Sequence, residues 1–218
     1  MHSRPSPAGS PKRLALLGCL LASGCYLGSA RNTSLADLGG DKNWEMLEGV
    51  REVHQVDRED CGAAALAMVL GYWGLPITRD AIEAAMPPAG GIRADDLRNF
   101  ARRRGMQAFL IRGQLDDFQR ELQLRRPVLV GLMKRHPWRF YPHYEVVVGI
   151  NRAKQRILTL DPAHGLRLNS SEGFTAEWAK AGYLTLIVFR QDQPVPQPSF
   201  HATQVTPLPP IRGSSPSN

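Results

Sequence analysis

A cysteine, Cys61, stands where a polar loop gives way to an apolar stretch, residues 61–73, rich in Ala, Leu and Met. Apolar residues at helical spacing predict a buried helix there, with Asp60 as its N-cap and Cys61 in its first turn. The N-terminus of a helix carries partial positive charge and unpaired N–H groups, and both stabilise a thiolate. The position of this cysteine therefore predicts a nucleophile.

A nucleophilic thiol needs a base, a group that orients the base, and donors for the oxyanion. Five histidines that follow the first 24 residues are candidate bases: His54, His136, His143, His164 and His201. We favour His143, because it opens a predicted strand directly after a loop and could face a helix N-terminus. The alternative for any one histidine is a hydrogen-bonded structural role. Gln55, through its side-chain amide, and the backbone N–H of Cys61 are the candidate oxyanion donors.

Asp161 is the candidate orienting group. It ends the next predicted strand and precedes Pro162. Neighbouring antiparallel strands can bring the start of one beside the end of the next, which would place Asp161 near His143. The alternative interpretation is that Asp-Pro simply begins a turn. Asn151 and Glu145 are weaker candidates for the same role.

The composition excludes several other classes of site. The chain has a formal charge of +7, but its basic residues form no patch interleaved with aromatic residues, so we expect no nucleic-acid partner. Of the three cysteines, Cys19 and Cys25 belong to the N-terminal region, so the folded part is expected to hold neither a disulfide framework nor a cysteine-rich zinc site. The P-loop pattern is absent, and we expect neither ATP nor any other cofactor or metal to be needed.

Periodicity predicts helices first and strands afterwards. Helices are predicted at 61–73, 79–86, 94–104, 114–124 and 174–181, and strands at 106–112, 127–133, 143–150, 156–161 and 183–189. Residues 134–142 are predicted to form a loop. Short connections between the later strands favour an antiparallel sheet, and therefore an α+β domain.

The N-terminus is typical of an exported protein. Residues 14–24 are apolar and about as long as a signal-peptide core, too short to span a bilayer. They end at Leu21-Ala-Ser-Gly-Cys25, which resembles a bacterial lipobox, so we expect lipidation at Cys25. Leu16-Leu-Gly-Cys19 is a second, less favoured match, and an ordinary signal cut near Ala30 is the other alternative. Acyl chains would tether the protein to a membrane, facing the periplasm or exterior, with the outer membrane favoured in a Gram-negative host.

These features predict four segments. A lipoprotein signal peptide covers residues 1–24, and a tether rich in Gly, Ser and small polar residues covers 25–46. The folded domain is predicted at 47–190. Residues 191–218, rich in Pro, Gln and Ser, are predicted to be a disordered tail.

Three separated motifs carry a resemblance to a known family. Gln55-x5-Cys61-Gly62, the segment His143-Tyr-Glu-Val-Val-Val-Gly-Ile150, and Leu160-Asp161-Pro162-Ala163 occur in the right order over roughly residues 50–190. The chain resembles the bacteriocin-processing double-glycine leader peptidases, which are papain-like cysteine peptidases often fused to ABC exporters. The resemblance implies a papain-like fold, with Cys61 as nucleophile, His143 as general base, Asp161 as its orienting group and Gln55 as oxyanion donor.

The resemblance also implies a substrate and a partner. Members of the family cut leader peptides after Gly-Gly, so the expected substrate is a peptide or protein, and no exporter is attached within these residues, so a separate exporter is an expected partner. Two alternatives stay open. One is a papain-like amidase or transglutaminase-type acyl transferase, and the other is a lipoprotein that binds leader peptides without cutting them.

Overall fold

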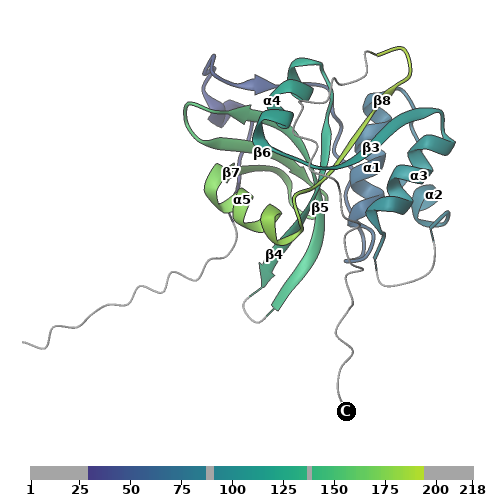
Figure 1. The fold of residues 1–218 in the computed structure, drawn as a ribbon. Coiled ribbons are helices and arrows are strands. Elements are labelled where there is room, and N and C mark those ends of the chain that lie inside the picture. Colours follow the sequence, from purple (N-terminus) through teal and green to yellow (C-terminus); the bar gives the residue numbers. More distant parts are fainter. Residues whose placement is uncertain (1–28, 87–90, 137–138, 194–218) are drawn as a thin grey trace, which may run out of the picture.

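The computed structural model describes residues 29–86, 91–136 and 139–193 (Figure 1). The predicted signal peptide, Cys19, Cys25, His201 and nearly all of the predicted tail lie outside the described residues. The elements in chain order are β1 (Ala30–Asn32), η1 (Ala36–Leu38), β2 (Glu45–Met46), α1 (Cys61–Tyr72), α2 (Arg79–Glu83), α3 (Ala94–Arg103), β3 (Met106–Arg112), α4 (Leu115–Gln123), β4 (Val128–His136), β5 (Arg139–Asn151), β6 (Arg156–Asp161), β7 (Gly165–Ser170), α5 (Ser171–Lys180) and β8 (Leu184–Arg190).

The described strands form one antiparallel sheet, in the order β1-β7-β6-β5-β4-β8-β3, and β2 pairs with β5. β5 and β6 are joined by a short turn and pair from Asn151 opposite Arg156 to Val146 opposite Leu160. This register brings the C-terminal end of β6 beside the N-terminal half of β5. The α+β architecture predicted from the sequence is therefore confirmed.

Helices α1, α2 and α3 cover one face of the sheet (Figure 1). α1 is apolar around its whole circumference, and all ten residues from Cys61 to Leu70 are buried, as expected for a helix enclosed on every side. Its second residue, Gly62, allows close approach of β5, since a Cβ there would meet the Tyr144 ring at 3.1 Å. The start of α1 is thus held directly against the middle of β5.

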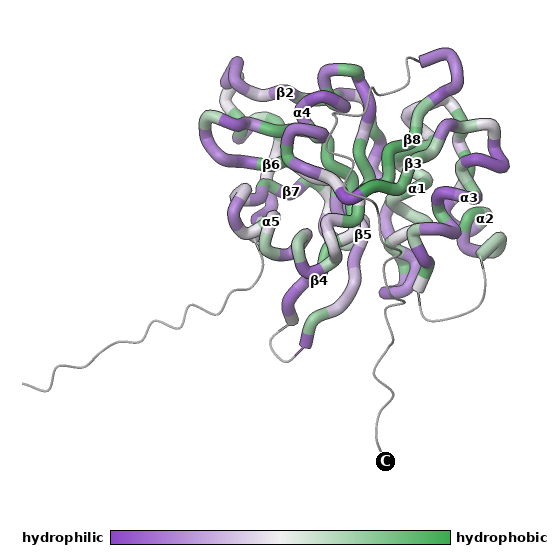
Figure 2. The backbone as a smooth tube through the Cα atoms, viewed as in Figure 1, coloured by the Kyte–Doolittle hydropathy of each residue, from purple (hydrophilic) through white to green (hydrophobic). Residues whose placement is uncertain are grey.

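Helices α4 and α5 cover the other face through a cluster of aromatic side chains. Phe118 of α4 and Trp178 of α5 have ring centroids 4.6 Å apart, and both pack against the sheet. The strands between the two layers alternate, so that Val146 and Val148 face α1 while Val147 faces the α4 and α5 side. Figure 2 shows these hydrophobic segments running through the interior of the molecule.

The structure differs from the sequence expectations at three places. Residues 29–46, expected to be part of a tether, belong to the domain, since β1 pairs with β7 and β2 with β5. The predicted loop at 134–142 instead extends β4 and β5, which pair as far as His136 opposite Arg139. β7 was not predicted. Polar residues such as Arg31 and Lys134 interrupt the apolar alternation that marks a strand, so the sequence did not reveal these strands. In the folded protein, cross-strand pairing and buried ion pairs offset the cost of placing polar residues there.

No helix in the described ranges is long and apolar enough to cross a membrane.

Candidate active site

Cys61 is the first residue of α1 and is 5% exposed. It is the free cysteine of the described residues. Asp60 precedes it at the N-cap position, as predicted, but its side chain makes no capping hydrogen bond to the helix. Its buried carboxylate instead accepts from the backbone N–H of Val56 at 3.0 Å and pairs with Arg79 Nη1 at 3.0 Å. Asp60 therefore closes the loop that leads into the cysteine.

His143 lies within β5, opposite Leu132 of β4, and is 5% exposed. It does not open the strand as expected, because the strand begins at Arg139. Its Nε2 donates to Asp161 Oδ1 at 2.7 Å, and Asp161 closes β6 and is 3% exposed. The same carboxylate oxygen accepts from the backbone N–H of Ala163 at 2.8 Å. The strand register places Asp161 beside His143, as the sequence interpretation required.

The electrostatics of the site favour a charged pair. Burial favours the neutral imidazole, but hydrogen bonds to Asp161 and Cys61 and the charges of both groups outweigh it and raise the pKa of His143 to about 10. Burial also opposes ionisation of Asp161, yet the hydrogen bond and charge of His143 lower the pKa of that carboxyl to about 2. With Nε2 directed to Asp161, the ring's Nδ1 remains for the Cys61 thiol. The carboxylate and the thiol therefore both act on the protonation of the ring.

Gln55 is held at the same site by its backbone. Its N–H donates to the carbonyl of Pro162 at 3.0 Å, so the loop before α1 is joined to the turn after Asp161. Its side-chain Nε2 donates to the Asp57 carbonyl at 3.0 Å, and its Oε1 is buried without a hydrogen-bond partner among the described residues. One of the two amide N–H groups of Gln55 is therefore still available to another acceptor.

The other residues considered as base or orienting group have different partners or are exposed. Glu145 contacts Lys134, and Asn151 donates to Asp41 at 2.9 Å, so neither orients His143. His54 is exposed, and its Nδ1 lies 3.3 Å from the Pro162 carbonyl. His164 is exposed, and the side chain of His136 lies outside what the structure describes.

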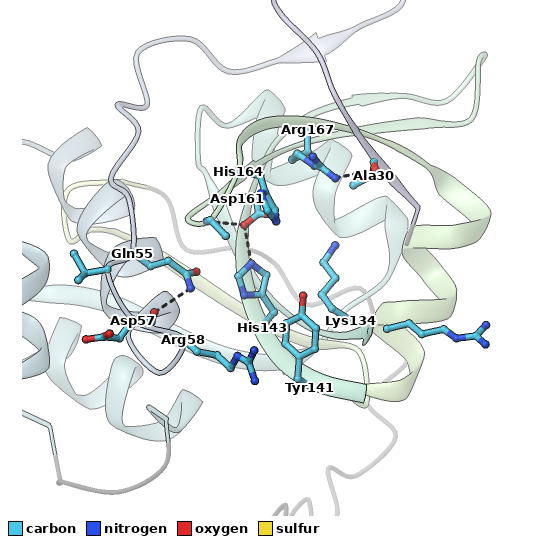
Figure 3. Close-up of a pocket in the computed structure, with 13 residues that line it drawn as sticks. Ala30, Gln55, Asp57, Arg58, Lys134, Tyr141, His143, Asp161, His164 and Arg167 are labelled. Carbon is cyan, nitrogen blue, oxygen red and sulfur yellow. Dashed lines mark hydrogen bonds and ion pairs between the residues drawn. The ribbon is translucent and has the colours of Figure 1, made fainter. Parts of the chain in front are cut away.

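Beside His143 lies a cavity of about 250 Å³, named here the side pocket (Figure 3). Its lining includes Gln55, His143 and Asp161, together with residues that the sequence did not single out: Arg58, Lys134, Arg135, Tyr141 and Arg167. Tyr141 stands two residues before His143 on β5, and their ring centroids are 6.3 Å apart. The predicted loop at 134–142 hid this pocket, because β4 in fact continues through Lys134 to His136.

Lys134 is buried between two carboxylates at this pocket. Its Nζ lies 2.6 Å from Glu145 Oε1 and 2.8 Å from Glu177 Oε2. Burial disfavours the ammonium, but the two carboxylates reverse the effect and raise the pKa of Lys134. The positive charge of Lys134 in turn helps to keep Asp161 ionised.

A metal site is the other chemistry that these groups could support. Among the described residues, His143, Glu145 and Asp161 can bring one ligand atom each within 4.8 Å of one another. Each of these groups already has a partner, since His143 donates to Asp161 and Glu145 pairs with Lys134. The three are therefore accounted for by hydrogen bonds and ion pairing.

Comparisons with known proteins identify the family and the fold. The family model described as "Peptidase C39 family" matches residues 50–192. The chain is 31% identical over 127 residues to the pediocin PA-1 transport/processing ATP-binding protein PedD of Pediococcus acidilactici, which covers 58% of this chain and 17% of that protein. The chain thus spans about a sixth of the length of this curated relative.

Two solved structures share the fold. The peptidase domain of Streptococcus ComA, a bifunctional ABC transporter, superimposes with a TM-score of 0.55 at 23% identity, covering 66% of this chain and 100% of that one. A double glycine motif protease from an AMS/PCAT transporter, solved in complex with the leader peptide, gives a TM-score of 0.52 at 20% identity, covering 66% and 93%. The fold is therefore papain-like, as expected. Because the family model matches more than half of the sequence, the chain belongs to the Peptidase C39 family and is a cysteine-type peptidase, a hydrolase.

Proposed function

We propose that this chain hydrolyses peptide bonds through a thioacyl intermediate on Cys61. The observation that carries the proposal is the imidazole of His143, which is bonded to Asp161 Oδ1 at 2.7 Å through Nε2 and whose pKa is raised by Asp161 and by the Cys61 thiol. The charge of the imidazolium attracts a thiolate at the start of α1. Asp161 holds the ring in the orientation that this exchange needs.

The steps follow from these positions. The Cys61 sulfur attacks the carbonyl carbon, and the oxyanion receives hydrogen bonds from the backbone N–H of Cys61 and the free N–H of Gln55 Nε2. The C–N bond then breaks as His143 gives its proton to the leaving amine. In the second half, His143 takes a proton from water, the hydroxide attacks the thioester, and the acid product leaves while Cys61 is restored.

We infer that the bond cut follows a Gly-Gly pair in a leader peptide. Support comes from the relatives: one is a transport and processing protein for pediocin PA-1, and one solved neighbour is a double glycine motif protease bound to a leader peptide. A separate exporter is the proposed partner, because the pediocin PA-1 relative is itself a transport/processing protein.

We also propose that the mature chain begins at a lipidated Cys25 and is tethered to a membrane at the periplasmic or outer side. β1 supports this choice over a cut near Ala30. Ala30 pairs with Asn169 of β7, and the Ser29 hydroxyl donates to the Asn169 side chain at 2.8 Å. A cut at Cys25 keeps these contacts, whereas a cut near Ala30 removes them. Metabolic labelling with palmitate should be lost in Cys25→Ala and kept in Cys19→Ala, and labelling that survives Cys25→Ala would contradict the assignment.

The catalytic proposal is tested with purified protein and peptides that contain an internal Gly-Gly. Cys61→Ala and His143→Ala should each abolish cleavage while circular dichroism remains unchanged, and the exposed His54→Ala serves as the matched histidine control that stays active. Cleavage that persists in Cys61→Ala would overturn the proposal.

Added amine acceptors distinguish hydrolysis from acyl transfer by the product formed. Tight peptide binding by unmodified protein, with no cleavage and no reaction of Cys61 with an alkylating agent, would instead indicate a binding protein.

A further inference from the structure

The side pocket adjoins the imidazole of His143 and not the thiol of Cys61. His143 and Asp161 line it, whereas Cys61 does not. During acyl transfer the acyl part stays on the thiol and the leaving amine lies against the imidazole that protonates it. The residues that follow the scissile bond therefore extend from the thiol past His143, toward Tyr141 and the loop that holds Arg58.

The pocket carries positive charge without a matching negative charge. Arg58, Arg135 and Arg167 line it, and within the described part of the chain none of the three forms an ion pair with a carboxylate. Arg58 lies over the Tyr141 ring, 5.7 Å from its centroid, and Arg167 donates to the carbonyl of Ala30 and to the side chain of Asn32.

The acidic residues at the pocket do not neutralise these arginines. Asp161 is bonded to His143, and Glu145 and Glu177 bind Lys134. Figure 3 shows the Asp57 carboxylate directed away from His143, while the guanidinium of Arg58 lies toward Tyr141. A guanidinium presents its donors in a planar fork that matches a carboxylate.

We propose that the side pocket is a subsite for the segment after the scissile bond, and that it selects an aspartate or glutamate side chain within the first three residues of that segment. The proposal rests on the peptidase function proposed above. Arg58 supplies the principal bidentate contact, and the Tyr141 hydroxyl, which makes no hydrogen bond with the described residues, is a second donor. The volume of about 250 Å³ leaves room for one such side chain with ordered water.

The test uses peptides with a fixed sequence through Gly-Gly and with Glu, Gln or Lys at the first, second or third following position. The wild-type protein should cleave the Glu peptide with kcat/KM about tenfold above that of the Gln peptide at one of these positions, and the advantage should shrink as salt is added. Arg58→Gln should remove the preference, and Arg58→Glu should invert it toward Lys. Arg152→Gln, an exposed arginine in the β5–β6 turn, is the control that should keep it.

Equal kcat/KM for Glu, Gln and Lys at all three positions would overturn the subsite and leave the peptidase function standing. Absence of cleavage for every peptide would contradict the peptidase function instead. The subsite is then decided by binding to Cys61→Ala protein, measured by calorimetry. Glu peptides should bind about tenfold tighter than Gln peptides, and equal binding would overturn the proposal independently of turnover.

Discussion

The backbone N–H of Gln55 donates to the carbonyl of Pro162, at 3.0 Å. These residues lie on either side of the site, Gln55 in the loop before α1 and Pro162 directly after Asp161. This hydrogen bond thus joins the segment that leads to the cysteine with the strand end that orients His143. The relative position of the thiol, the imidazole and the carboxylate depends on this junction and on the packing of α1 against β5.

Replacing Asp161 should change the pH profile as well as the rate. In Asp161→Ala the imidazole loses the partner that raises its pKa, so the alkaline limb of the kcat profile should move to lower pH. We expect kcat to fall by about 10²- to 10⁴-fold. Asp161→Asn should lose less, because the amide carbonyl still accepts from Nε2. The exposed Asp116→Asn is the control, and an alkaline limb unchanged in Asp161→Ala would show that this carboxylate does not tune His143.

The stability contributed by His143 should decrease as the pH rises. Its pKa is higher in the folded protein, at about 10, than the ordinary value of 6.5, so the charged ring stabilises the fold fully below about pH 6.5 and progressively less toward pH 10. The difference in Tm between wild type and His143→Gln should therefore be largest at acidic pH. The control is Val130→Ala, a substitution of a buried residue on the paired strand β4 that has no titratable group. Its difference in Tm from wild type should not vary with pH.

Removing the ammonium of Lys134 should destabilise the fold strongly. Lys134→Met leaves Glu145 and Glu177 buried with their shared cation gone, and such a change costs about 3–5 kcal/mol. Lys154→Met, which removes an exposed ammonium from its pair with Asp41, should cost much less than Lys134→Met. Urea denaturation of both variants measures the contrast. Equal free energies of unfolding would mean that the buried pair contributes no more than the exposed one.

Asp60 should matter for catalysis through the loop it closes. Asp60→Asn weakens the pairing with Arg79 and loosens the segment between Gln55 and Cys61. We expect kcat/KM to fall by about tenfold, since small misplacements of reacting groups are costly. The neighbouring Asp80→Asn, which also removes a carboxylate from Arg79 but is exposed, should retain wild-type kcat/KM. A Tm loss in Asp60→Asn with kcat/KM unchanged would restrict Asp60 to a structural role.

Much of the core was predictable because buried elements have strong periodicity. The apolar run that begins at Cys61 is consistent with a buried helix, which is α1. The predicted bounds of β3 and β6 are the observed ones. The hairpin of β4 and β5 was predicted too short, because Lys134 and Arg135 look like loop residues until the carboxylates of Glu145 and Glu177 are placed beside Lys134. Those partners lie on another strand and on α5, and local sequence carries no information about them.

The sequence by itself determined that a lone cysteine begins a buried helix, that an α+β domain follows, and which histidine, aspartate and glutamine to examine. These conclusions depend on residue type and short-range spacing, because the periodicity of helices and strands appears directly in the local sequence. Only the tertiary structure decided that Nε2 of His143 meets Asp161, that the Asp60 carboxylate binds Arg79, and that residues 30–32 and 45–46 complete the sheet. It also decided that the side pocket is lined by arginines with no carboxylate partner among the described residues. Those relationships join residues far apart along the chain, and they exist only once strand register and packing bring them together.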